Sequence, residues 1–258
     1  MKQEQPDGRR FLTLRLAAIS GFLVLVAPAL AGPPYSTDDP QPVDFHHWEA
    51  YLVGTWNREG TGTTGDAPHI EVNFGAAPNL QLHVIAPLSY SRALRGGSTY
   101  GPGDVELGMK YRFVEETDSR PQIGAFPLVE LPSGDASRGL GDGSVRAFLP
   151  LWLQKTVEKW TTYGGGGYWI NPGEGNKDWW FAGWQAQMQL TSVFAPGAEV
   201  FYQSPQTVGG SAEVRFNVGA ILDVEEHHHI LFSAGRAFHG CHCSQAYVAY
   251  LLTLGPKS

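Results

Sequence analysis

The sequence predicts an all-β protein, a single transmembrane antiparallel up-and-down β-barrel of about 12 strands that follows a cleaved signal peptide. Three observations predict this fold. Apolar and polar residues alternate with a period of two, about 12 such segments recur along the chain, and the connections between them alternate between long and short. Beyond residue 31, no stretch reaches about 18 consecutive apolar residues, so a membrane-spanning chain must close as a barrel.

The N-terminus has the parts of a secretory signal peptide. Lys2, Arg9 and Arg10 give a positive start, residues 11–30 are largely apolar, and Ala31 ends an A-x-A-like cleavage site. An uncleaved anchoring helix is the alternative, and Arg15 disfavours it by interrupting the apolar stretch. The expected organisation is a signal peptide at 1–31, an extended periplasmic lead-in or a plug in the lumen at 32–45, and an outer-membrane β-barrel at 46–258.

The charge balance bears on possible partners. Residues 1–31 hold four of the 18 bases and two of the 25 acids, so the remaining chain carries a net charge of −9. We therefore expect no nucleic-acid partner, because such a partner requires a basic surface. The 32 Gly, 8 Trp, 10 Tyr and 13 Phe suit turns and membrane interfaces, but a soluble β-sandwich could have similar totals.

Alternation is clearest in residues 104–113. One face carries Val105, Leu107, Met109, Tyr111 and Phe113, and the other carries Asp104, Glu106, Gly108, Lys110 and Arg112. A wall strand with one face toward lipid and one toward the lumen requires this pattern. Reading the chain in the same way predicts strands at 46–57, 68–76, 80–91, 103–114, 121–132, 143–154, 160–170, 179–190, 196–204, 212–223, 229–238 and 245–254.

The predicted connections alternate in length, as in outer-membrane barrels with long outer loops and short periplasmic turns. The long ones are 58–67, 92–102, 133–142, 171–178 and 205–211, and the short ones are 75–79, 115–120, 155–159, 191–195 and 224–228. An even number of strands places both ends of the barrel on the periplasmic side.

The inward face of these strands predicts a charged lumen. Its lining should be either a path that guides solutes or a packed interior that closes the barrel, because charges held inside must be paired. Arg112, Arg146 and Arg215 are the bases expected to set selectivity, since rings of charge tune pores. The predicted lumen-lining residues are Glu49, Glu71, His83, Asp104, Glu106, Lys110, Arg112, Glu130, Arg146, Gln185, Gln187, Glu199, Arg215 and Asp223.

Aromatic and glycine-rich stretches fit a barrel wall. Gly164 to Gly167 form a run without the Lys and Ser/Thr of a phosphate loop, which predicts a bend or thin spot in the wall. Ring side chains near strand ends predict interfacial belts. These are Trp48, Trp56, Trp160, Trp169, Trp179 and Trp180.

Two weak candidates for other chemistry remain. Cys241, His242 and Cys243 carry thiolate and imidazole donors that suit zinc or copper, although an oxidised or simply exposed cysteine pair is favoured after export. The run of histidines at 227–229 is expected to be a polar turn at the rim opposite to Cys241 and Cys243. His83 could act as a base only beside a nucleophile, and none is evident in the sequence.

Several short motifs resemble a known family. They are Gly103-Asp104, Lys110-Tyr111-Arg112-Phe113, Leu131-Pro132-Ser133-Gly134-Asp135 and Gly139-Leu140-Gly141. In their order and spacing they are similar to the outer-membrane transporter family named for the meta-pathway of phenol degradation, over about residues 34–254. The resemblance implies a barrel associated with uptake of small, often aromatic compounds, and it transfers no binding residue. Leu254 stands where bacterial barrels usually end in an aromatic residue.

The expected function is therefore an outer-membrane channel or transporter for passive uptake of small, aromatic or hydrophobic molecules, without a cofactor and without enzymatic activity. The expected location is the outer membrane of a Gram-negative bacterium. Expected partners are outer-membrane lipid, a small-molecule solute and the barrel-assembly machinery. The alternatives are a barrel-embedded lipid hydrolase, seeded by His83, and a closed structural or metal-binding barrel, seeded by Cys241 and Cys243.

Overall fold

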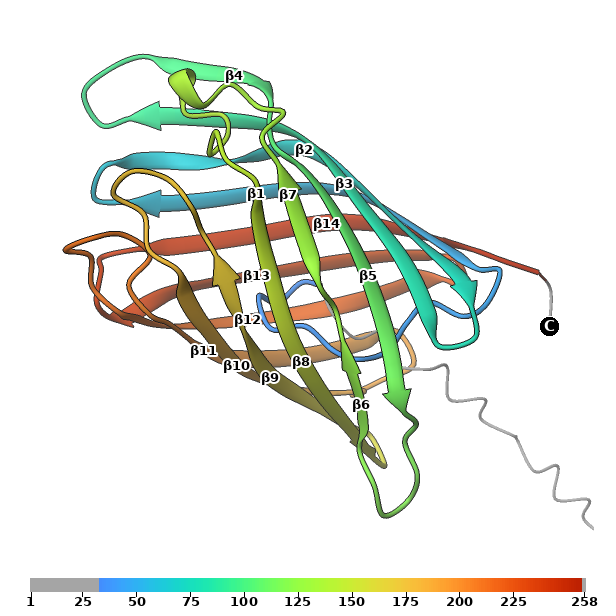
Figure 1. The fold of residues 1–258 in the computed structure, drawn as a ribbon. Helices are drawn as coiled ribbons and strands as arrows, with labels where there is room; N and C mark the ends of the chain where they lie inside the picture. Colours follow the sequence, from blue (N-terminus) through green and yellow to red (C-terminus); the bar gives the residue numbers. More distant parts are fainter. Residues whose placement is uncertain (1–32, 257–258) are drawn as a thin grey trace, which may run out of the picture.

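The computed structural model describes residues 33–256, which form an antiparallel barrel with one short 3-10 helix (Figure 1). The predicted signal peptide lies outside the described residues. The elements are β1 (Trp48–Glu59), β2 (Gly62–Ala77), β3 (Leu80–Ala93), β4 (Ser98–Pro102), β5 (Val105–Val114), β6 (Gln122–Ala125), β7 (Leu128–Leu131), η1 (Ala136–Arg138), β8 (Arg146–Val157), β9 (Trp160–Ile170), β10 (Trp179–Met188), β11 (Phe194–Gln203), β12 (Glu213–Glu225), β13 (His228–His239) and β14 (Ser244–Leu254).

The sheet closes on itself because β1 pairs with β14, from Trp48 opposite Leu254 to Arg58 opposite Ser244. β4 and β5 both pair with β3 and continue one another along the wall. β6 and β7 likewise lie end to end between β5 and β8. The 14 strands of the described chain therefore make a wall 12 strands around, and the predicted fold class is confirmed.

The alternation along each strand separates an apolar outer face from a polar inner face. Leu52 and Ile70 are each 53% exposed, whereas their neighbours Tyr51 and Glu71 are 4% and 6% exposed. Large apolar side chains project outward in this way around the wall, including Leu107, Leu151 and Val218. A continuous exposed apolar surface of this kind marks a membrane interface. Within residues 33–256, no helix is long and apolar enough to cross a membrane.

The connections define two rims. At the terminal rim lie both ends of the barrel and the connections 78–79, 115–121, 158–159, 189–193 and 226–227, and the remaining connections lie at the loop rim. The predicted loops 58–67 and 92–102 were wrong. β1 and β2 continue to a turn at 60–61, and β3 and β4 continue to a turn at 94–97 (Figure 1). Backbone pairing between partner strands outweighs the Gly- and Thr-rich composition there.

Two predicted strands are interrupted. The predicted strand 103–114 begins only at Val105, after a break at Gly103 and Asp104 that separates β4 from β5. The predicted strand 121–132 is divided between β6 and β7 at Phe126 and Pro127, since proline cannot donate a hydrogen bond to the ladder. The predicted alternation between long and short connections therefore holds only from residue 132 onward.

The glycine run lies within β9 and stays paired with β8 and β10 along its length. At Gly165, which has a positive φ of 155°, an added Cβ would lie 3.0 Å from the Trp152 ring and 2.1 Å from the carbonyl oxygen of Leu151. The missing side chains let inward rings of β8 lie directly on the wall.

Two buried apolar clusters occupy the interior. One contains Tyr51, Val53, Leu231 and Leu251, and the other is an aromatic cluster on β8 to β11 that also includes Phe126 of the β6–β7 junction. Trp169 and Trp179 were predicted in an outer belt but join the second cluster, because they occupy inward positions of β9 and β10 and stack at 5.5 Å between ring centroids. Trp48, Trp56, Trp160 and Trp180 are exposed.

Candidate functional site

Residues 33–47 (the inner segment) lie inside the barrel, where they curl across the lumen before β1 begins (Figure 1). The Glu199 carboxylate on β11 accepts hydrogen bonds from the backbone N–H groups of Ser36 and Thr37, each at 2.8 Å. On the opposite wall, Gln81 of β3 accepts one from the Val43 N–H at 2.9 Å. Hydrogen bonds to opposite sides of the wall suspend the inner segment across the barrel.

The wall is shaped to receive the inner segment. A Cβ added to Gly183 of β10 would lie 2.1 Å from the Thr37 hydroxyl oxygen, and one added to Gly197 of β11 would lie 2.6 Å from the Tyr35 hydroxyl oxygen. Any side chain at these two inward positions would occupy the place that the segment now fills. The inner segment is thus packed as part of the barrel interior.

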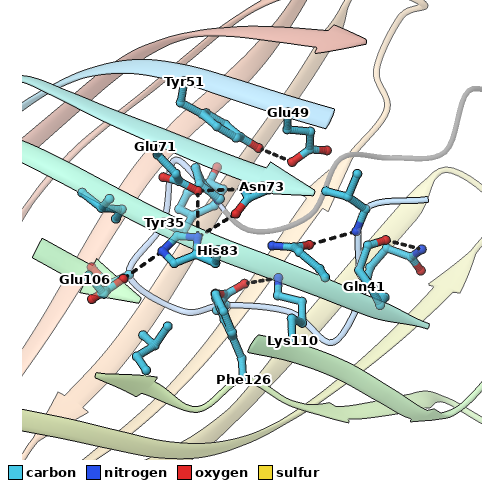
Figure 2. Close-up of a pocket in the computed structure, with 18 of the residues that line it drawn as sticks. Tyr35, Gln41, Glu49, Tyr51, Glu71, Asn73, His83, Glu106, Lys110 and Phe126 are labelled. Carbon is cyan, nitrogen blue, oxygen red and sulfur yellow. Dashed lines mark hydrogen bonds and ion pairs between the residues drawn. The ribbon is translucent and has the colours of Figure 1, made fainter. Parts of the chain in front are cut away.

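A cavity of about 240 Å³ lies between the inner segment and the wall formed by β1, β2, β3, β5 and the β6–β7 junction (Figure 2). Its surface combines carboxylates and amides with apolar groups such as Ile85, Phe126 and Leu128. A small molecule in this cavity would contact both the wall and the inner segment.

Polar side chains from three neighbouring strands meet at His83. Its Nδ1 lies 2.6 Å from the Asn73 side-chain oxygen, and its Nε2 lies 2.9 Å from Oε1 of Glu106. Glu71 accepts a hydrogen bond from the Asn73 amide at 2.9 Å and lies 3.7 Å from His83. Figure 2 shows these groups converging from β2, β3 and β5. They meet because these strands are paired and their inward positions lie at the same height in the barrel.

An ion pair joins the inner segment to the wall. Lys110 of β5 donates to Asp38 at 2.9 Å and lies 3.5 Å from Asp39. Asp39 is fully buried, and its burial raises the pKa of that carboxyl to about 7, although Lys110 opposes the shift. Burial also raises the pKa of the Tyr35 phenol above its ordinary value, which keeps the phenol neutral.

The fourteen residues predicted to line the lumen occupy inward positions, and none of them is exposed. They do not form one site. Glu49, Glu71, His83, Glu106 and Lys110 surround the cavity. Glu199 and Arg112 hold the inner segment, Gln185 and Gln187 are buried along β10, Asp223 pairs with His229 near the terminal rim, and Asp104, Glu130, Arg146 and Arg215 lie toward the loop rim.

The three arginines expected to set selectivity are each engaged elsewhere. Arg112 donates to Asn79 and Gln41 near the terminal rim. Arg146 pairs with Glu130 and Asp142, and Arg215 pairs with Glu213, both toward the loop rim. Asp104 accepts the backbone N–H groups of Gly134 and Asp142, so it fixes the 132–145 loop.

Some site residues were not anticipated. Asp38 and Asp39 lie outside every periodic segment, and Tyr51, Asn73 and Gln81 occupy inward positions whose alternation was visible but whose side chains were not selected. Tyr51, Asn73 and Gln81 each lie two positions from Glu49, Glu71 or His83. Because inward residues recur at every second position, this spacing was the signal that could have identified them.

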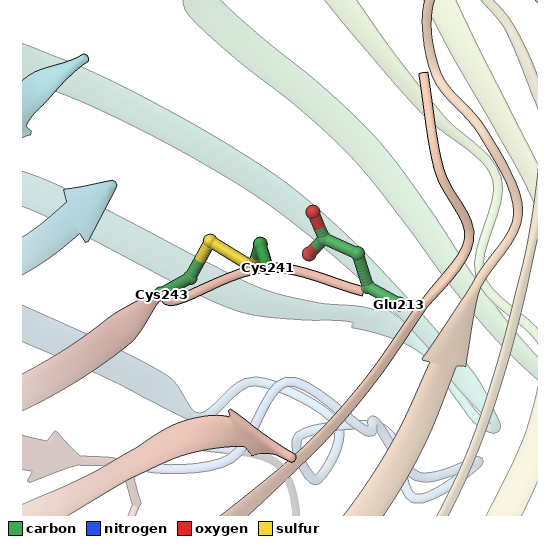
Figure 3. A group of neighbouring side chains, drawn as sticks. All are labelled: Glu213, Cys241 and Cys243. Carbon is green, nitrogen blue, oxygen red and sulfur yellow. A yellow bond between two sulfur atoms is a disulfide. The ribbon is translucent and has the colours of Figure 1, made fainter. Parts of the chain in front are cut away.

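Cys241 and Cys243 are joined in a disulfide near Glu213 (Figure 3). In this state they supply no thiolates, which are the ligand form that zinc or copper requires. The histidines at 227–229 lie at the terminal rim, where His229 bonds to Asp223 at 2.7 Å. The two candidate groups therefore lie at opposite ends of the barrel.

No protein-family model matches the chain, and no curated protein matches it. Solved structures do. The KdgM porin in complex with disordered oligogalacturonate has a TM-score of 0.54 at 8% identity, covering 78% of this chain and 98% of that one. The NanC porin has a TM-score of 0.53 at 7% identity, covering 81% of this chain and 100% of that one. Both likenesses concern the fold, a porin-type barrel.

Proposed function

We propose that the chain is an outer-membrane channel for the passive uptake of small molecules. The observation that carries the proposal is the closed barrel with an apolar outer face and a polar interior that encloses a cavity. Lipid contact explains the exposed apolar side chains, and solute contact explains a lumen lined with hydrogen-bonding groups instead of a continuous apolar core. One porin of similar fold, KdgM, has been solved in complex with oligogalacturonate.

The solute class that the sequence motifs suggest is small and aromatic or hydrophobic, by their resemblance to the transporter family of the meta-pathway of phenol degradation. The aromatic cluster on β8 to β11 supports this choice, since it places Phe148, Trp169 and Phe201 on the inner side of the wall. We further propose outer-membrane lipid as the surrounding partner and the barrel-assembly machinery as the partner during insertion.

The geometry around His83 does not favour the hydrolase alternative. Both ring nitrogens are within hydrogen-bond distance of Asn73 and Glu106, so neither is directed at a serine, threonine or cysteine nucleophile. A nucleophilic hydrolase requires such a group beside its base. The function proposed for the chain is accordingly transport without catalysis.

Swelling of liposomes tests the proposal. Purified chain is reconstituted into vesicles and diluted into isotonic arabinose, a small neutral sugar, and light scattering records solute entry. We expect faster swelling than in protein-free vesicles, and slower entry of a larger sugar such as raffinose. Equal rates with and without demonstrably inserted protein would overturn the proposal, whereas ester hydrolysis by the same vesicles would favour the hydrolase.

A further inference from the structure

We propose that the lumen selects small organic cations that carry an aromatic or apolar group, and that the carboxylates around the cavity set this preference. The inference rests on the proposed channel function and names its substrate class. Three features of the interior carry it: the charge balance at the cavity, the positions of the paired arginines, and the aromatic surface that continues from the cavity.

The cavity carries an excess of acid. Five carboxylates line it, and the cationic groups beside them are Lys110 and His83. With all five carboxylates ionised and both Lys110 and His83 charged, the lining carries a net charge of −3. Carboxylates that line one cavity repel one another, and an entering cation relieves that repulsion. The five are Asp38, Asp44, Glu49, Glu71 and Glu106.

Glu49 is a wall carboxylate of the cavity that has no cationic partner in the described part of the chain. It accepts a hydrogen bond from the Tyr51 hydroxyl at 2.8 Å, and within residues 33–256 no ion pair joins it to a base. Glu71 is bound to the neutral amide of Asn73. Lys110, by contrast, is directed toward Asp38 and Asp39 of the inner segment, which reduces the positive charge that a solute would meet.

Two of the three arginines are neutralised by carboxylates, and the third lies outside the cavity lining. Arg146 and Arg215 have carboxylate partners toward the loop rim, and Arg112 is directed at the side-chain oxygens of Asn79 and Gln41 near the terminal rim. A charge that is paired at a rim contributes little to ion preference, whereas acidic groups that line a pore favour cations.

The aromatic cluster adjoins the cavity through Phe126, which belongs to both. From there the rings continue along the inner wall, with Phe181 and Phe201 5.6 Å apart and Phe148 and Trp169 4.9 Å apart between centroids. Two cations of the chain already lie over these rings: Lys110 Nζ is 4.9 Å from the Phe126 centroid, and the Arg146 guanidinium is 5.5 Å from that of Trp169. Ring faces beside carboxylates suit an ammonium group with an aromatic part.

Ion selectivity in a planar bilayer tests the charge component. With a potassium chloride gradient across the inserted channel, the reversal potential gives the ratio of potassium to chloride permeability. We expect a ratio above 1 that falls by about threefold or more in Glu49→Gln/Glu71→Gln, because acidic groups in a pore set its cation preference. Glu174→Gln, which removes one carboxylate at an exposed loop position, should leave the ratio unchanged.

Current block tests the solute class. Phenyltrimethylammonium, a permanent aromatic cation, should reduce the potassium current at concentrations where tetramethylammonium and benzenesulfonate do not, and the block should weaken in Glu49→Gln. The single variant Glu49→Gln keeps the buried Glu71, so a folding defect caused by changing Glu71 cannot affect this measurement.

The outcomes separate the two proposals. Folded, inserted protein that passes no current would overturn the channel function itself. A conducting wild-type channel with a ratio of 1 or below, or with equal block by benzenesulfonate, would overturn the cation preference and leave the channel function standing.

Discussion

Glu199 is the wall residue that holds the inner segment through two backbone hydrogen bonds, and the charge on its carboxylate strengthens both. Replacing it in Glu199→Gln should weaken docking by about 2 kcal/mol or more, since hydrogen bonds to charged groups contribute about 1.5–3 kcal/mol each. We expect protease cleavage within residues 33–44 to rise roughly 30-fold, measured by mass spectrometry of intact vesicles. Asp223→Asn, which changes an acid paired with His229 at the rim, is the matched control. Unchanged cleavage in Glu199→Gln would show that this carboxylate does not hold the segment.

Asp39 makes docking of the inner segment depend on pH. The docked carboxyl has a pKa of about 7, and a released segment in water has an ordinary aspartate pKa near 4. Between these values the docked state binds more protons, so docking weakens as pH rises from about 4 to about 7 and stays weak above. Besides Asp39, the charged groups nearby are Lys110, Asp38 and Glu49.

From pH 5 to pH 8 the loss of docking free energy should reach at most about 3 kcal/mol. The measurement is the rate of cleavage within the inner segment at both pH values, normalised to Asp39→Asn, whose docking should not change over this range. Cleavage that is faster at pH 5 than at pH 8 after normalisation would contradict the assignment.

The sequence carries information on residues whose environment repeats along a strand. Glu71, His83, Lys110 and Arg215 were placed on the inner face because every second position shares that face. It could not anticipate Asp38 and Asp39, because their partner Lys110 lies 71 or more positions away and the inner segment has no period to read. Pairing over such distances depends on how the whole wall closes.

At the level of elements, the inner segment depends on small residues in β10 and β11. Gly183→Val should displace the segment, because the Cβ alone would lie 2.1 Å from the Thr37 hydroxyl oxygen. Ala182→Val, at the adjacent position on the exposed outer face, is the control. We expect faster cleavage of residues 33–44 and larger channel conductance in Gly183→Val alone, with the same heat-dependent gel mobility in both. Identical conductance in the two variants would argue that the segment does not narrow the lumen.

Alternation of apolar and polar residues predicted the strands more reliably than Gly- and Thr-rich composition predicted the loops. Period-two alternation predicted a wall of 12 strands, although it did not include β4 and it read β6 and β7 as one strand. The Gly- and Thr-rich residues near 62–65 and the residues at 98–102 were read as loops, yet pairing with β1 and β3 makes them strands. Hydrogen bonds between partner strands act across the sheet and leave no local signature in composition.

For the whole molecule, a charged side chain introduced on the apolar outer face tests whether that face lies in lipid. Leu107→Arg, on the outward face of β5, should destabilise the barrel by about 2–4 kcal/mol if that residue lies near the bilayer centre. Val208→Arg, an exposed apolar loop position, should change stability by no more than about 0.5 kcal/mol. Urea unfolding in lipid vesicles measures both, and equal small effects would place the outer face in water.

Single-channel recording from purified protein in a planar bilayer tests most directly whether the barrel is a channel. A closed wall of 12 strands with a polar interior and a cavity beside the inner segment should give steady unitary current steps. Steps that grow in Gly183→Val would show that the current passes through the lumen. Absence of steps in both wild type and Gly183→Val, from protein whose insertion and heat-dependent gel mobility are verified, would contradict a conducting lumen.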